Sequence, residues 1–140
     1  MDILKVPFPQ FLNIEKSNRQ GFIFKLTQHP QLINHLGTIH ACAQLTLAEA
    51  TSGEFLLNEF YGIREQVIPV MRKTEVKYQK PGNGSLYSKA SFSKIDKALV
   101  YDELSRKSRA IIPIKVEVFN EANERTLLAV FDWFVANKEI

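Results

Sequence analysis

The sequence has 140 residues, of which 45% are hydrophobic and 24% are charged, and its single cysteine is Cys42. These proportions are typical of one folded domain, and they exclude disordered, collagen-like and low-complexity classes. One cysteine excludes an internal disulfide and a multi-cysteine zinc site. The formal net charge of +3 is compatible with an anionic small ligand, but it does not indicate nucleic-acid binding.

The sequence shows no segment typical of export or of membrane insertion. Its first residues lack a basic region followed by an apolar run of the signal-peptide kind. The most apolar stretch, Leu127 to Ala136, is interrupted by Asp132 and is shorter than the roughly 20 residues of a transmembrane helix. We therefore expect a cytoplasmic protein without membrane insertion. Residues 1–140 should form one domain, with an arm or short helix over residues 1–19.

The first half of the chain predicts a short strand and one long buried helix. Residues 21–27 are aromatic and β-branched, which predicts a strand ended by a loop over 28–36. From Thr38 to about Leu57, apolar residues occupy most of the circumference of a helix, with Thr38 as its N-cap. This pattern is typical of a buried helix, although Gly53 weakens it by about 1 kcal/mol relative to alanine.

The second half predicts a strand-rich region with one short helix. Alternation of apolar and polar residues places Val70 and Thr74 on the same face of the first of these strands. Ser93 and Asp96 have the form of a capping box at the start of the helix. The predicted elements are strands over 67–78, 85–92, 109–119 and 126–135, and a helix over 96–107.

This order of elements predicts an α+β fold in which about five mostly antiparallel strands wrap one central helix. Such a sheet covers only one side of the helix. The other side, or an edge of the sheet, therefore needs cover, and we expect a second copy of the chain to supply it.

The segment from Asn34 to Cys42, followed by Leu47-Ala48-Glu49-Ala50, is the part of the sequence that indicates chemistry. A polar loop leads into the N-terminus of the buried helix, where unsatisfied N–H groups suit a carbonyl oxygen that becomes an oxyanion. Glu49 lies on an otherwise apolar segment, where a carboxylate is costly unless it is paired or functional.

The pattern N-x-x-G-T-x-H followed by L-A-E is formed here by Asn34, Gly37, Thr38, His40 and Glu49. It resembles the pattern of hotdog-fold thioesterases of the phenylacetic-acid-pathway type, in which an Asp or Glu follows the Asn at the same spacing. The strand end over 76–81 and the final hairpin are also similar to those of this family. The resemblance covers roughly residues 20–136.

The resemblance implies a hotdog fold, with a five-to-six-stranded antiparallel sheet wrapped around one long central helix. It implies a homodimer, or a tetramer of two dimers, with acyl-CoA at the dimer interface. The activity implied is acyl-CoA hydrolysis, with coenzyme A as part of the substrate and no separate cofactor. The residues themselves offer no metal-binding constellation, and the mixed charges of the strands do not indicate a nucleic-acid patch. The acyl chain would lie beside the helix, against Leu45, Phe55 and Phe60.

The resemblance also implies roles for individual residues. Glu49 would activate water or attack the thioester directly, and Asn34 would orient the water or the carbonyl. The oxyanion and substrate-binding residues would be Gly37, His40, Ala41 and Cys42, with the backbone N–H near Ala41 holding the oxyanion. The phosphates of coenzyme A would be bound by Arg106, Lys107 and Arg109, and by Lys80.

Two departures from the family pattern open an alternative. Ala41 and Cys42 replace a Gly-Gly pair, which narrows or closes the thioester site. Some relatives carry a Ser or Thr where this chain has Met71, so that hydroxyl is missing unless Thr74 supplies it. A non-catalytic module that binds acyl-CoA is therefore a second interpretation.

Several of these residues also have structural interpretations. Asn34 is typical of a loop cap, and His40 of a residue that braces a loop. The basic cluster at 106–109 suits the C-terminus of a helix, where cations complement the dipole. His35 precedes Glu49 by a spacing that resembles that of hotdog hydroxyacyl-thioester dehydratases, but their H-F-P-G motif is absent.

Overall fold

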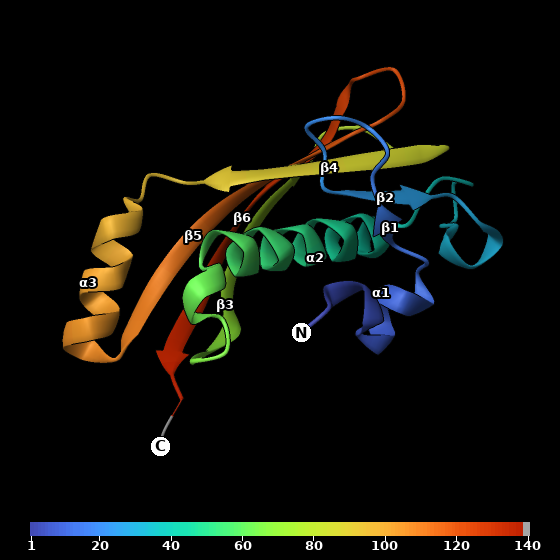
Figure 1. The fold of residues 1–140 in the computed structure, drawn as a ribbon. Coiled ribbons are helices and arrows are strands. Elements are labelled where there is room, and N and C mark those ends of the chain that lie inside the picture. The colour runs from blue at the N-terminus through green and yellow to red at the C-terminus, as the bar shows by residue number, and fades with distance from the viewer. Residues whose placement is uncertain (139–140) are drawn as a thin grey trace.

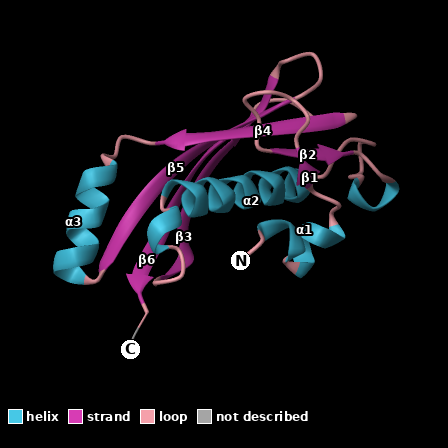
Figure 2. Cartoon of the chain, viewed as in Figure 1, coloured by secondary structure: helices cyan, strands magenta, loops and turns pink. Residues whose placement is uncertain are grey.

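The computed structural model describes residues 1–138 as one antiparallel sheet curved around a long helix, with the N-terminal segment on the helix's other side (Figures 1 and 2). The strand order is β1-β2-β4-β5-β6-β3. This confirms the expected α+β arrangement, and β1 adds a sixth strand. The strands are β1 (Glu15–Lys16), β2 (Phe24–Thr27), β3 (Val67–Tyr78), β4 (Ser85–Phe92), β5 (Arg109–Phe119) and β6 (Arg125–Asn137). The helices are α1 (Pro7–Phe11), α2 (Ala41–Glu59) and α3 (Lys97–Lys107), with short 3₁₀ turns at Ile3–Lys5, Pro30–Leu32 and Tyr61–Ile63.

The central helix α2 begins at Ala41, three residues later than the sequence predicts. Its N-cap is His40, whose Nδ1 accepts a hydrogen bond from the Cys42 backbone N–H at 3.0 Å. Thr38 cannot cap the helix, because its hydroxyl and its backbone N–H are both bonded to the Asn34 side chain. The prediction of Thr38 as N-cap is therefore wrong.

Three side-chain hydrogen bonds fix α2 against the inner face of the sheet. The Thr126 hydroxyl of β6 donates to Gln44 Oε1 at 2.9 Å, and the Trp133 indole N–H of β6 donates to Ser52 Oγ at 2.9 Å. The hydroxyls of Thr51 and Ser88 are also bonded to each other, which ties the helix to β4. These buried polar pairs set the rotation of α2 about its axis, and so they decide which way Glu49 points.

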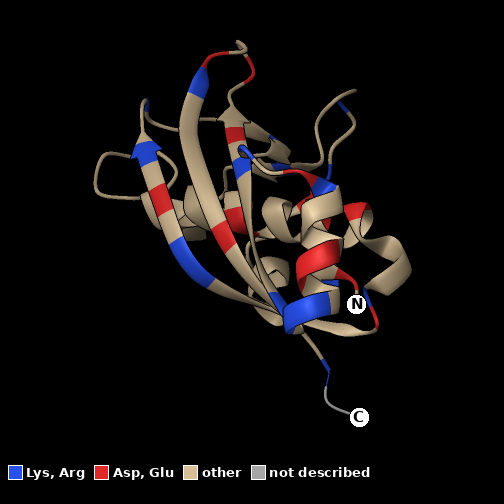
Figure 3. Cartoon of the chain, turned by 90° about the vertical axis from the view of Figure 1, so that its left-hand side faces the viewer, with Lys and Arg blue, Asp and Glu red and all other residues tan. Residues whose placement is uncertain are grey.

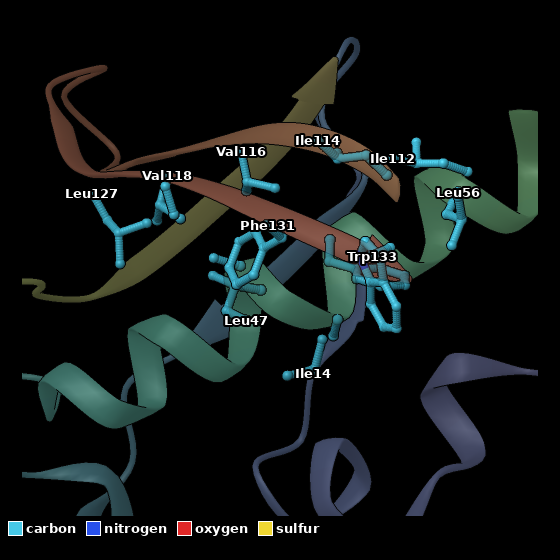
Figure 4. Packing of buried hydrophobic residues seen from close by; sticks show 14 of the residues in the cluster. Ile14, Leu47, Leu56, Ile112, Ile114, Val116, Val118, Leu127, Phe131 and Trp133 are labelled. Carbon is cyan, nitrogen blue, oxygen red and sulfur yellow. The ribbon is translucent and has the colours of Figure 1, made fainter. Parts of the chain in front are cut away.

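The core lies between α2 and the inner faces of β5 and β6 (Figure 4). Leu47 and Phe131 are buried at its centre, and Trp133 projects from β6 toward the helix (Figure 4). Residues that alternate along β5 and β6 are buried on this face and partly exposed on the other. Residues 1–138 contain no helix that is long and apolar enough to cross a membrane.

Strand β3 is an edge strand that contains a bulge at Arg72, because Met71 pairs with Trp133 while Lys73 pairs with the next residue, Asp132. One extra residue reverses the faces of all residues that follow. Val70 therefore lies on the outer face, 53% exposed, whereas Thr74 lies on the inner face. The expectation that they share a face is wrong for this reason.

The helix α3 packs against the N-terminal end of β5. Asp96 is its N-cap and accepts a hydrogen bond from the Ala98 N–H, so Ser93 is not the capping residue as the capping box predicts. Val100 and Leu104 are buried beneath the helix. Its last turn carries Arg106 and Lys107 of the basic cluster, whereas Arg109 begins β5. The strands carry charges of both signs (Figure 3).

Candidate functional site

Glu49 lines a cavity of about 290 Å³ on the side of α2 that faces the N-terminal segment and the start of β3. Trp133 and Pro69 form the sheet side of this cavity. Glu49 is the only ionisable side chain among the residues that line it. The remaining lining residues are Met1, Ile3, Val6, Phe8, Pro9, Ala50, Gly53, Leu56 and Leu57.

The Glu49 side chain is half-buried. Within residues 1–138, no ion pair and no hydrogen bond to its side-chain oxygens forms; the Ser52 hydroxyl bonds to the backbone carbonyl instead. Burial raises the pKa of the Glu49 carboxyl above its ordinary value. A carboxylate with these surroundings is a stronger base toward water than an exposed one.

A second cavity, of about 230 Å³, lies beside the N-terminus of α2. Asn34, Ala41, Tyr78 and Lys80 are among the residues that line it. Partial burial raises the pKa of the Tyr78 phenol, and repulsion from a Cys42 thiolate adds to the rise. Like any phenol with an unlowered pKa, it is protonated at neutral pH. It can donate a hydrogen bond into the cavity.

The Asn34 side chain closes the loop that precedes α2. Its Oδ1 accepts hydrogen bonds from the Leu36 N–H at 2.9 Å and the Thr38 N–H at 3.0 Å, and its Nδ2 donates to the Thr38 hydroxyl at 2.9 Å. Gly37, at φ +77°, allows the chain to turn within this loop. Asn34 thus acts as a loop cap, and one of its two Nδ2 protons remains available to a ligand.

At the start of α2, the backbone donors near Ala41 differ in availability. The Cys42 N–H is bonded to the His40 ring. The Ala41 N–H, in contrast, forms no hydrogen bond within residues 1–138, and Ala41 is exposed at the second cavity. Of these two backbone donors, only the Ala41 N–H is free within residues 1–138, because capping has used that of Cys42.

Because His40 caps α2, we predict that replacing it lowers the stability of the fold. Replacing it with alanine removes the acceptor of the Cys42 N–H, so the free energy of unfolding should fall by about 1 kcal/mol. Aspartate or asparagine at this position should restore most of that loss, since either can cap a helix. Urea unfolding of the three variants tests this. Equal stability of His40→Ala and the parent protein would contradict a capping role.

The other predicted substrate-binding residues line neither cavity. Gly37, His40 and Cys42 do not line the second cavity, although they flank residues that do. His35 is exposed in the loop and lines neither cavity. Met71 and Thr74 point to the inner face of β3 and also line neither.

The predicted cations lie at opposite ends of the sheet. Arg109 pairs with Ala136, which in turn pairs with Ile68 near the start of β3, whereas Lys80 follows the end of β3. Lys80 is bonded to Glu124, and this contact lowers the pKa of the Glu124 carboxyl. Arg106 forms an ion pair with Asp102 of the same helix, and Lys107 and Arg109 are exposed.

Sequence reasoning missed much of the wall of the Glu49 cavity. The expected acyl contacts, Leu45, Phe55 and Phe60, do not line it. Phe55 and Phe60 pack instead on Phe92, with ring centroids 5.0 and 6.0 Å away. The N-terminal arm, Gly53 and Trp133 take their place. A glycine within a buried helix was the available signal, since it marks a close approach to another group.

A family model described as "Domain of unknown function (DUF4442)" matches residues 9–135 of the sequence. No curated protein matches the sequence. The fold is similar to that of several solved structures. One is a protein of unknown function from Pseudomonas aeruginosa, described as a probable thioesterase, with a TM-score of 0.81 and 16% identity over 97% of this chain and 91% of that one.

Two further structures show the same fold at low identity. A thioesterase from Haemophilus influenzae has a TM-score of 0.72 and 16% identity, over 96% of this chain and 86% of that one. A hypothetical thioesterase from Streptococcus pneumoniae, crystallised with coenzyme A, has a TM-score of 0.63 and 19% identity, over 91% and 87%. The sheet wrapped around α2 is thus the hotdog fold that the sequence resemblance implies.

Proposed function

The chain belongs to the DUF4442 family, and from that premise we propose that it is an acyl-CoA thioesterase that acts as a homodimer. One observation carries the proposal. The unpaired carboxylate of Glu49, with its raised pKa, lines an otherwise apolar cavity large enough for an acyl group. The similarity to structures named as thioesterases, one of them with coenzyme A, supports this choice of substrate.

In the proposed reaction, Glu49 takes a proton from a water molecule as the water oxygen attacks the thioester carbonyl carbon. The carbonyl oxygen becomes an oxyanion, which the Ala41 N–H at the positive end of α2 stabilises. The C–S bond then breaks, the acid is released, and the coenzyme A thiolate takes up a proton. Direct attack by Glu49 on the carbonyl carbon, followed by hydrolysis of the anhydride, is the second route.

Within one chain, Glu49 and the Ala41 N–H are too far apart to act on the same thioester. Glu49 and Ala41 lie eight residues apart on α2, about 12 Å along the helix axis, and they line separate cavities. One thioester carbonyl cannot contact both. We therefore place the active site between two copies, with Glu49 of one chain opposite Ala41 and Asn34 of its partner.

The edge strand β3 supports this dimer. It is 12 residues long, and no strand within residues 1–138 pairs with its outer side. A long exposed edge favours pairing with another strand. The Glu49 cavity reaches this edge at Pro69. Antiparallel pairing of two β3 strands would bring the start of one beside the end of the other. Arg109 of one copy would then approach the Lys80 end of the second, as binding of one coenzyme A by both cations requires.

Hydrolysis is tested by release of free thiol from a panel of acyl-CoAs with saturated chains of increasing length. The proposal expects saturable release that depends on Glu49. If no acyl-CoA is cleaved faster than in buffer, the chain is not an acyl-CoA thioesterase.

The composite site is tested by a heterodimer of two inactive variants, Glu49→Gln and Asn34→Asp. The aspartate keeps the two acceptor bonds that close the loop but removes the Nδ2 donor. In the heterodimer, one site would combine both substitutions and the other would be intact, so about half of the parent activity should return. A heterodimer as inactive as either homodimer would place the whole site within one chain.

The capping of Cys42 by His40 favours the alternative of a binding module, because it removes one backbone donor from the site. Calorimetry with coenzyme A and with an uncleavable acyl-CoA thioether separates the two. Tight binding of both without thiol release from the thioesters would support the binding module.

A further inference from the structure

The N-terminal arm, defined as residues 1–11, forms one wall of the Glu49 cavity. Five of the lining residues come from it: Met1, Ile3, Val6, Phe8 and Pro9. The opposite walls come from α2, β3 and Trp133 of β6. The arm lies on the side of α2 away from the sheet (Figure 1). Without the arm, this cavity would lose the wall that lies away from the sheet, and Glu49 would lie in a shallower groove.

The arm is a built part of the fold. The Asp2 side chain accepts a hydrogen bond from the Leu4 N–H at 3.0 Å and so caps the first turn. Pro9 is buried, and the residues that follow the arm, Leu12 and Ile14, are only 4% and 5% exposed. The arm is therefore capped at its start and followed by residues that are anchored in the core.

Gly53 lies where the arm meets the sheet side of the cavity. A Cβ atom at this position would lie 3.4 Å from Ile3 Cδ1 and 3.5 Å from Trp133 Cζ2, which is ordinary van der Waals contact. Ile3 and Trp133 thus meet across the glycine and close this part of the cavity. Any side chain larger than a methyl group at 53 would have to occupy cavity space.

Resting on the proposed function, we propose that the arm and Gly53 limit the length of the acyl chain that the cavity accepts, and that the preferred substrates are medium-chain acyl-CoAs. The cavity of about 290 Å³ is roughly twice the 150 Å³ of a dry apolar cavity that takes up benzene, a six-carbon ring. It therefore fits an acyl group of roughly eight to twelve carbons. Apart from Glu49 its lining is apolar, so polar acyl groups should bind poorly, because most of their polar atoms would find no hydrogen-bond partner there.

The test measures the affinity of uncleavable acyl-CoA thioethers with two to sixteen carbons by calorimetry, and kcat/KM for the matching thioesters. Each methylene buried in the cavity should tighten binding by roughly fourfold until the cavity is full. For the parent protein, the gain should stop at roughly eight to twelve carbons. Affinity that is flat with length, or that still rises at sixteen carbons, would overturn the proposal.

Two variants test the walls. In Gly53→Leu, the four added carbons should fill cavity space, so the decanoyl thioether should bind at least tenfold more weakly while the butyryl thioether binds almost unchanged. Equal loss at all lengths would contradict a measuring role. Circular dichroism establishes that the variant is folded, since overpacking can destabilise a core.

Phe8 and Phe11 offer a matched pair on the surface of the arm. Both belong to α1 and are 61% and 58% exposed, but only Phe8 lines the cavity. Phe8→Ala should weaken binding of the medium-chain thioethers several-fold and reduce the preference for them over long chains. Phe11→Ala should match the parent protein. Identical profiles for the two variants, or a general rise in activity for Phe8→Ala at every length, would overturn the role of the arm.

The outcomes separate this inference from the proposed function. A length optimum for the thioethers without cleavage of any thioester would support the arm as the limit on acyl-chain length and reject hydrolysis. Cleavage of thioesters with no dependence on chain length would support hydrolysis and reject the role of the arm.

Discussion

Replacing Glu49 with glutamine should lower kcat for acyl-CoA hydrolysis by at least about 100-fold, because general acid–base catalysis contributes roughly that factor or more. The amide keeps the size and polarity of the side chain but cannot take the proton from water. In the parent protein, kcat/KM should fall as the pH decreases through the raised pKa of Glu49, since the reactive form is the carboxylate. That acidic limb should therefore lie above the ordinary glutamic acid value of 4.5.

The same substitution should stabilise the fold at neutral pH. A carboxyl whose pKa is raised on folding binds its proton more tightly in the folded state, so its contribution to stability is present below pH 4.5 and is lost as the pH rises through the folded pKa. At neutral pH the parent protein holds an unpaired carboxylate in a half-buried site, and glutamine does not. Tm should therefore increase at pH 7, and the difference should vanish below pH 4.5.

Glu54→Gln is the matched control. Glu54 lies on the same helix but does not line the cavity. Burial also raises its pKa; the nearby Asp2 adds to the rise and Lys16 opposes it. This variant should gain stability at neutral pH for the same reason and keep the hydrolysis rate. Full hydrolytic activity in Glu49→Gln, or an equal loss of activity in both variants, would remove Glu49 as the catalytic base.

Replacing Trp133 with alanine should lower the free energy of unfolding by about 3–5 kcal/mol, a large part of the stability of a domain of this size. The indole is 8% exposed, and its N–H is bonded to Ser52. The substitution removes core packing and enlarges the Glu49 cavity at its sheet side. Binding of acyl-CoA thioethers should therefore extend to longer chains, as measured by calorimetry below the unfolding temperature.

Phe131→Ala separates the two effects of the tryptophan. Phe131 is 1% exposed on the same face of the same strand, but it does not line the cavity. It should lose a comparable amount of stability, measured by urea unfolding, and keep the acyl-length profile of the parent protein. A shift of the profile in this variant as well would indicate that core loosening, rather than removal of the cavity wall, changes the length preference.

The sequence located the candidate residues better than it located their surroundings. Alternation and apolar crowding predicted every strand of more than four residues and the central helix, because those signals reflect which faces are buried. The Asn34 loop and Glu49 were found by their spacing. The start of α2 was misplaced because Asn34, four residues earlier in the chain, holds Thr38, and because an imidazole rather than a hydroxyl caps the helix. The bulge at Arg72 left no comparable signal, so the face of Val70 was wrong.

By itself, the sequence determined the α+β architecture and a carboxylate within a buried helix, because burial periodicity and the cost of a buried charge act locally along the chain. Only the tertiary structure decided that residues 1–11 form a wall beside Glu49, that Gly53 lies between Ile3 and Trp133, and that Ala41 and Glu49 line different cavities. Those facts depend on contacts between residues up to about 130 positions apart in the chain. The hydrogen bonds of Gln44, Thr51 and Ser52 set the rotation of α2 over the sheet and so decide which of its residues take part in such contacts.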